Sequence, residues 1–156
     1  ADNLVVGSYS DWRLPTLVDT GTSGCNFAYS GSDCGYNVSA STSEMAHLYY
    51  VTLGNKAIRN TAGAYFFGAG LSNTGPFSNV QSYEYWSGTV YAPSTGSAWY
   101  FNTINGGQNY HDRLLKFSAL AVRSGDVAAA VPEPQTYVLA LAGLAAAALL
   151  ARKRRA

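Results

Sequence analysis

The chain has 156 residues, of which 47% are hydrophobic and only 12% are charged, and its 10 Lys and Arg residues nearly balance 9 Asp and Glu residues. That length fits one ordinary domain plus a tail. Residues 1–130 hold six basic and eight acidic side chains, a net charge of −2, whereas residues 152–155 are all basic. The first 130 residues therefore lack the basic excess that binds phosphate, which disfavours a nucleic-acid partner, and they are too aromatic for a disordered chain.

Near the start, residues 19–23 spell Asp-Thr-Gly-Thr-Ser. The same string surrounds the catalytic aspartate of aspartic proteases, in which two carboxylates share a proton and activate water. Only one copy is present, so such an enzyme would have to be a homodimer. Because Gly and Thr are also ordinary turn residues, we favour a turn here and keep a protease only as the third hypothesis for the function.

Cys25 and Cys34 enclose an eight-residue loop. Two cysteines at this spacing are most simply explained by a disulfide across the loop. Free thiols and a metal site are the alternatives. Since His47 and His111 lie far apart in the sequence and match no known ligand spacing, we predict no metal and no cofactor.

One clear helix is predicted after the cysteines. Ser41-Thr42-Ser43-Glu44 fits the capping box, a Ser followed three residues later by Glu, which typically begins a helix. Apolar residues recur at helical spacing from residue 45 to residue 53, and Gly54-Asn55 can end the helix. His47 lies beside the apolar stripe and is expected to be a core-edge or surface residue.

Short aromatic runs follow at residues 64–67, 83–87, 98–101 and 120–123, separated by Gly, Ser, Asn and Thr. They predict short strands joined by long loops. A turn signal at residues 104–107 predicts that residues 97–102 and 108–112 form an antiparallel hairpin. We expect Trp12, Trp86 and Trp99 in the core, with Arg13 and Arg123 tying loops together through their guanidinium donors.

Tyr, Asn and Gln residues around this hairpin have the chemistry to stack on a sugar and to hydrogen-bond with it. A Tyr-rich surface without a ligand is the alternative. Since sequence motifs for phosphate loops, nucleophile elbows and Ca²⁺ loops are absent, no catalytic residue is predicted. The candidate ligand-binding residues are Tyr91, Tyr100, Asn105, Gln108, Asn109 and Tyr110.

The composition changes abruptly after residue 130. Two prolines in Val131-Pro132-Glu133-Pro134 predict an extended spacer. Residues 136–151 carry no charge, and as a helix they span about 24 Å against a hydrocarbon core of about 30 Å. A membrane segment is favoured over a buried helix because no polar face exists, and because the basic residues 152–155 can reach the interface and stay on the cytoplasmic side.

This order of parts resembles the PEP-CTERM sorting signal of Gram-negative bacteria. The resemblance implies an exosortase, a membrane protease or transpeptidase, as the partner, and delivery of the globular part to the cell envelope. It implies that the chain crosses the inner membrane once, with its globular part in the periplasm. The globular part could then be delivered to the cell surface or the extracellular space. The residues that carry the resemblance are Val131, Pro132, Glu133, Pro134, Arg152, Lys153, Arg154 and Arg155.

An export signal is expected in such a protein, yet Ala1–Leu4 has no initiator Met, no basic stretch and no apolar stretch. Either the signal has been removed or the chain is incomplete, and of the two we favour a domain at residues 1–126 that is incomplete at its N-terminus.

A second resemblance covers residues 7–125. The segments that carry it are Trp-Arg-Leu-Pro-Thr at residues 12–16, the predicted helix at residues 44–48, and residues 85–89, 98–101 and 121–123. In that order they look like the Lcl C-terminal-type domain, an uncharacterised bacterial extracellular module, although Met45 and Gly88 replace its usual Leu and Ser. The resemblance implies an α+β fold akin to C-type lectin-like and formylglycine-generating-enzyme-like domains, and it implies no activity.

We therefore predict four parts: a small α+β domain of short antiparallel strands, one helix and long loops at residues 1–126, a linker with the Pro-Glu-Pro box at 127–135, a transmembrane helix at 136–151 and a basic tail at 152–156. The predicted function is that of a non-enzymatic exported envelope protein, membrane-anchored or processed by an exosortase. The alternative is a carbohydrate-binding or adhesion module that acts on extracellular polysaccharide.

Overall fold

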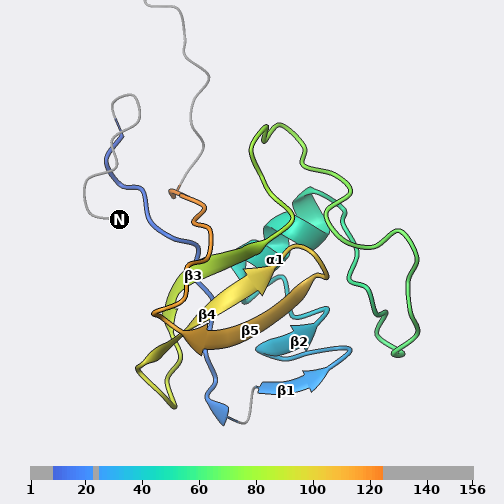
Figure 1. Cartoon of the computed structure of the whole chain (residues 1–156), viewed down its shortest axis with the longest axis horizontal. Coiled ribbons are helices and arrows are strands. Elements are labelled where there is room, and N and C mark those ends of the chain that lie inside the picture. Colours follow the sequence, from blue (N-terminus) through green and yellow to red (C-terminus); the bar gives the residue numbers. More distant parts are fainter. Residues whose placement is uncertain (1–8, 23–24, 125–156) are drawn as a thin grey trace, which may run out of the picture. The chain divides into compact units, whose positions relative to one another are not determined.

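A computed structural model of the chain describes residues 9–22 and 25–124. These residues form a five-stranded sheet with the order β1-β2-β5-β4-β3, and one short helix packs beside it (Figure 1). Four neighbouring strands pair antiparallel, so the prediction of a small domain with short antiparallel strands and a helix is confirmed. The strands are β1 (Cys25–Ala28), β2 (Cys34–Tyr36), β3 (Glu84–Val90), β4 (Ser97–Asn102) and β5 (Gly107–Asp112).

Strands β3, β4 and β5 form an antiparallel meander, which includes the predicted hairpin. Its turn requires glycine at Gly106, where φ is 72° and a Cβ would come within 2.9 Å of the Ala57 backbone. Side chains alternate between the two faces of a sheet. Trp99 and Phe101 are therefore buried on one face, whereas Tyr100 and Asn102 are partly exposed on the other.

The pairing of β1 with β2 differs from the prediction, because it is parallel. A regular parallel crossover takes a dozen or more residues, and the chain has only residues 29–33 between these strands. The pairing is accordingly bulged: Cys25 lies opposite Cys34, and Ala28 lies opposite Gly35. β2 then pairs antiparallel with β5.

The helix consists of α1 (Glu44–Ala46) and a π-helical continuation, η2 (His47–Thr52). The predicted capping box is wrong, because the N-cap is Ser43, whose Oγ accepts the Ala46 N–H at 3.2 Å. Glu44 is held by Arg13 instead of reaching back to the cap. The predicted end is confirmed, since the helix stops at Thr52 and Gly54 takes a φ of 67°.

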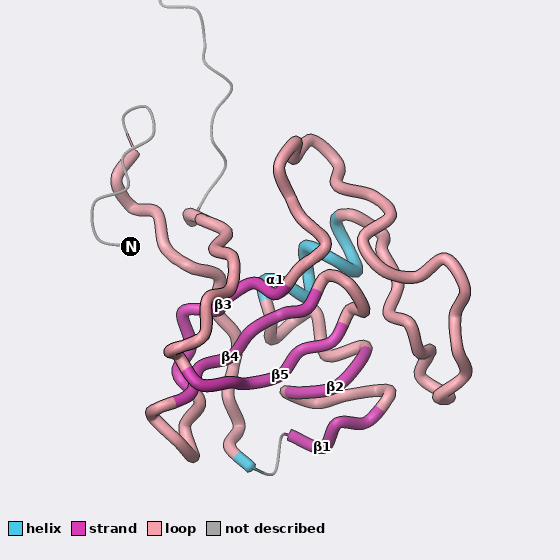
Figure 2. Tube along the Cα trace, in the orientation of Figure 1, coloured by secondary structure: helices cyan, strands magenta, loops and turns pink. Residues whose placement is uncertain are grey.

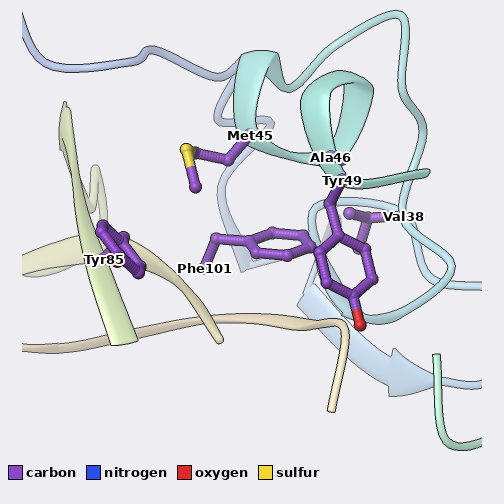
Figure 3. Packing of buried hydrophobic residues seen from close by; sticks show 6 residues of the cluster. All are labelled: Val38, Met45, Ala46, Tyr49, Tyr85 and Phe101. Atoms are coloured by element: carbon purple, nitrogen blue, oxygen red, sulfur yellow. The ribbon is translucent and has the colours of Figure 1, made fainter. Parts of the chain in front are cut away.

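Two clusters of buried side chains form the core, and the first of them joins the helix to the sheet. In the first, Phe101 of β4 points toward Tyr49 of the helix, with ring centroids 5.2 Å apart (Figure 3). Cys34, Tyr91 and Trp99 form the second cluster. Trp99 is fully buried as predicted, whereas Trp12 and Trp86 are only half-buried. The first cluster comprises Val38, Met45, Ala46, Tyr49, Tyr85 and Phe101.

Long loops make up most of the remaining described chain (Figure 2). Residues 64–67 were predicted to form a strand, but they lie in the loop before β3 and make only a single bridge, between Arg59 and Tyr65. Gly63 and Gly68 flank this run at φ near 80°, which turns the chain too sharply for a longer strand. Residues 120–123 likewise form no strand of the sheet, and Val122 makes one bridge with Arg13.

The predicted parts of the tail, at residues 127–135, 136–151 and 152–156, lie outside the described residues. Within residues 9–22 and 25–124, no helix has the length and apolar character needed to cross a bilayer.

An ion pair between Arg13 and Glu44 fastens the first described segment to the helix. The guanidinium donates two hydrogen bonds to the carboxylate, at 2.6 and 2.7 Å, and the Thr16 N–H donates a third at 2.7 Å. The Arg13 donors are the main reason why the pKa of Glu44 falls to about 2, against the opposing effect of partial burial. Arg123 binds Asp11 in the same way at 3.0 Å, so both arginines tie loops together as predicted.

This ion pair should make the stability of the domain depend on pH. A carboxyl group whose pKa is lowered by folding stabilises the fold above its unfolded pKa, and that contribution is lost as the pH falls through its folded pKa. We expect the free energy of unfolding to decrease by about 1–2 kcal/mol between pH 4.5 and pH 2 on account of Glu44, a value reduced for its partial exposure. Urea unfolding as a function of pH measures this decrease.

The variant Glu44→Gln should lose this part of the pH dependence, and Asp112→Asn, which alters an exposed carboxylate elsewhere, should keep it. An unchanged pH profile in Glu44→Gln would contradict the prediction.

Candidate functional site

The face of the sheet opposite the helix carries polar and aromatic side chains. Tyr100 pairs with Asn109 across β4 and β5, and Asn102 and Tyr36 both pair with Gly107. Directly paired residues share a face, so these side chains lie together. They surround a depression of about 240 Å³, the sheet-face hollow. Its lining residues are Gly35, Tyr36, Tyr100, Asn102, Asn105, Gly107, Gln108 and Asn109.

Hydrogen bonds hold the amides of this hollow in place. Asn102 donates to Glu84 at 3.0 Å and accepts the Ile104 N–H at 2.8 Å. The Asn105 oxygen accepts the Gly107 N–H at 2.7 Å. Burial raises the pKa of Tyr100, and the nearby Glu84 charge adds to this effect, so its phenol stays protonated at neutral pH. The hollow thus offers uncharged donors and acceptors beside aromatic rings, which is the chemistry of binding a neutral polar ligand.

Phe117 covers the neighbouring part of the same face. Its ring stacks on Trp86 with centroids 4.5 Å apart and meets Tyr100 at 4.9 Å. The Trp86 ring is therefore covered by Phe117 and is not open to a ligand. The open part of this face is the sheet-face hollow, on the side of Tyr100 away from Phe117.

The structure separates the six candidate ligand-binding residues. Tyr100, Asn105 and Asn109 line the sheet-face hollow. Gln108 also borders it, but its buried side chain accepts the Ser43 hydroxyl and donates to the Asp33 carbonyl, both at 2.6 Å, so it links β5 to the helix start.

Tyr91 is buried in the core, and Tyr110 of β5 is partly buried against it, so neither lies in an accessible loop. Their rings stack on each other at 3.7 Å, next to the buried Trp99. Sequence analysis missed Tyr36 and Asn102 as members of the hollow. For Asn102 a signal existed, because Tyr100 and Asn102 alternate with the apolar Trp99 and Phe101.

Asp19, from the protease-like string, is fully engaged in holding the fold. One oxygen accepts the Ala92 N–H at 2.6 Å and the Trp99 indole N–H at 2.9 Å, and the other accepts the Gly21 N–H at 2.7 Å. Burial alone would raise the pKa of Asp19, but these donors outweigh it and hold the pKa below its usual value. The carboxylate joins a turn at residues 19–21 to the hairpin of β3 and β4. This agrees with the interpretation of the Asp-Thr-Gly-Thr-Ser segment as a turn.

The two predicted disulfide cysteines come together at the sheet edge. Cys25 and Cys34 are register partners in β1 and β2, and Cys34 is fully buried. Neighbouring strands lie within the separation of Cα atoms that a disulfide needs. In the part of the chain that the structure describes, no three His, Cys, Asp or Glu residues are grouped closely enough to hold a metal ion.

Comparison with known proteins bears on the tail. A family model of the PEP-CTERM protein-sorting motif matches residues 130–155. No curated protein and no solved structure matches the chain. The resemblance of residues 7–125 to the Lcl C-terminal-type domain finds no support in these comparisons. The resemblance of the tail is confirmed: the chain carries a PEP-CTERM protein-sorting motif at residues 130–155, which indicates an exported, envelope-associated protein of Gram-negative bacteria that is processed by an exosortase.

Proposed function

We propose that the protein is held in the inner membrane by its sorting tail until an exosortase processes it, and that its globular part has no catalytic activity of its own. The observation that carries this proposal is the match of the sorting motif to residues 130–155. Residues 136–151 are uncharged and residues 152–155 are basic. That arrangement favours a single span with the basic residues in the cytoplasm and the globular part in the periplasm.

The roles of three acidic side chains support a non-catalytic globular part. Asp11 and Glu44 each bind an arginine, and Asp19 accepts three hydrogen bonds from the protein. The pKa of each of these groups is lowered, so all three are poor proton donors at neutral pH. A general acid or base needs a pKa near the working pH.

A second candidate function is the binding of a neutral saccharide by the sheet-face hollow. Tyr36 and Tyr100 supply ring surfaces there, and Asn105 and Asn109 supply amides of the kind that pair with sugar hydroxyls. In the envelope such a site would attach the globular part to extracellular polysaccharide.

A disulfide between Cys25 and Cys34 is part of the proposal. Their positions on paired strands and the oxidising conditions outside the cytoplasm both favour it.

The first test is the intact mass of the protein recovered from the envelope of a host with and without its exosortase. We expect a shortened C-terminus only where the exosortase is present, because the enzyme acts on the sorting tail. Changing Pro132-Glu133-Pro134 to Ala-Ala-Ala should leave the tail intact, whereas Arg113→Gln, a basic residue outside the motif, should not affect processing. The same full mass in both hosts would refute exosortase processing.

The second test compares saccharide binding by the whole protein and its variants on arrays of bacterial polysaccharides. Asn109→Ala and Tyr36→Ala should each weaken binding about tenfold or more, since each removes a contact from the hollow. Tyr65→Ala, an exposed tyrosine in another loop, is the matched control and should bind normally. Absence of binding by the unaltered protein would remove this candidate function.

The third test concerns the disulfide. The protein should gain about 2 Da on reduction, and reduction should lower the free energy of unfolding by about 2–3 kcal/mol, as the chain-entropy model gives for a loop of about ten residues. Mass spectrometry after alkylation, with and without reductant, measures the bond. Two thiols that are alkylated without reductant would contradict it.

A further inference from the structure

The loop between the helix and β3 extends away from the sheet (Figure 1). It exposes three consecutive aromatic side chains. Phe67 is 89% exposed, Tyr65 56% and Phe66 37%. We call residues 56–70 the aromatic loop. Adjacent exposed aromatics at the surface of a soluble domain usually mark an interaction site.

Hydrogen bonds give the aromatic loop a defined shape. The Phe66 N–H donates to the Ile58 carbonyl at 2.8 Å, and the Gly70 N–H donates to the Lys56 carbonyl at 3.0 Å. At its base the Ile58 N–H donates to the carbonyl of Asn105 at 3.0 Å. The exposure of the rings therefore follows from the fold of the loop and not from a lack of structure.

The loop is also positively charged. Lys56 lies 4.6 Å above the Phe66 ring, and Arg59 lies 5.4 Å from the Tyr65 ring. No Asp or Glu occurs between residues 45 and 83. Within the described part of the chain, the two ion pairs use Arg13 and Arg123, so neither Lys56 nor Arg59 has a carboxylate partner there. Arg59 also donates a hydrogen bond to the Gly63 carbonyl at 3.1 Å, which leaves its other guanidinium donors for an anionic partner.

We propose that the aromatic loop docks on the surface of a bilayer that contains anionic lipid. Aromatic side chains are favoured at the boundary between lipid tails and headgroups, and basic side chains are attracted to anionic headgroups. Tyr65, Phe66 and Phe67 enter the headgroup region, while Lys56 and Arg59 lie against the phosphates. The inference rests on the proposed membrane tether, which supplies the bilayer.

An acidic polysaccharide fits this surface less well. Sugars stack on open, flat ring faces, but cations lie over Phe66 and Tyr65, and the Phe67 ring meets Tyr65 at 64°. Phe66 and Phe67 also offer no hydrogen bond. A projecting apolar loop suits a soft lipid surface better than a rigid glycan chain.

The tether is long enough to permit docking. Residues 124–135, between the described domain and the predicted membrane segment, can span at most about 40 Å. A domain of this size is about 35 Å across, so the extended linker can span about one domain diameter.

The test uses the full chain reconstituted into lipid nanodiscs, made either with phosphatidylglycerol or with phosphatidylcholine alone. Hydrogen exchange of residues 64–68 should be at least threefold slower in the phosphatidylglycerol discs. Phe66→Ser with Phe67→Ser, and separately Lys56→Gln with Arg59→Gln, should abolish this slowing. Leu114→Ser is the matched control, since Leu114 is also 89% exposed and lies between basic residues, and it should leave the slowing intact.

Other outcomes overturn the proposal. Equal exchange in both kinds of disc refutes docking on anionic lipid, and slowing caused by soluble alginate in detergent assigns the loop to a polysaccharide. Slowing that increases with protein concentration assigns it to a second copy of the chain. A chain that does not enter nanodiscs refutes the membrane tether instead. Sedimentation with phosphatidylglycerol vesicles then tests the loop separately. We expect the unaltered protein to sediment with the vesicles and the Phe66→Ser and Phe67→Ser double variant to stay in solution.

Discussion

The paired hydrogen bonds between Arg13 and Glu44 hold together parts of the domain that are distant in the sequence. Glu44 begins the helix and also accepts hydrogen bonds from Thr16. The backbone of Arg13 pairs with Val122, so three separate segments meet at one residue. A short helix cannot organise such a domain through its own propensity. The charged side chain at its start, which is joined to the Arg13 segment, does so instead.

Buried polar side chains likewise hold distant loop segments together elsewhere in the domain. Asn55 is buried in the loop that connects the helix to β3. Its side-chain oxygen accepts the N–H groups of Ser72 and Asn73, and its side-chain nitrogen donates to the Asn73 carbonyl. Thr103 similarly binds the backbone of Gln81 and Tyr83. Irregular backbone has no ladder of its own, so buried amides and hydroxyls must satisfy it. This demand accounts for the use of Asn, Ser and Thr in the loops.

Local signals in the sequence predicted the features that depend on local chemistry. The Asn-Gly-Gly turn, the stop at Gly54 and the burial of Trp99 all follow from backbone preference or residue size. The start of the helix was misplaced because a distant Arg13 captures Glu44, which no local pattern reveals. The burial of Tyr91 against Tyr110 likewise depends on strand register, and so does the meeting of Tyr36 with Tyr100 in the hollow. The sorting motif is a linear sequence signal, so its prediction did not depend on the fold.

The antiparallel bridge between Arg13 and Val122 also determines how the domain carries mechanical load. Its two hydrogen bonds, each 2.8 Å long, join the first and last parts of the described domain. Tension applied through the chain on either side of this point would act first on the bridge and on the ion pair between Asp11 and Arg123. Hydrogen bonds pulled in this geometry open one after another, so the ends would peel apart under low force while the sheet and its hollow stayed intact.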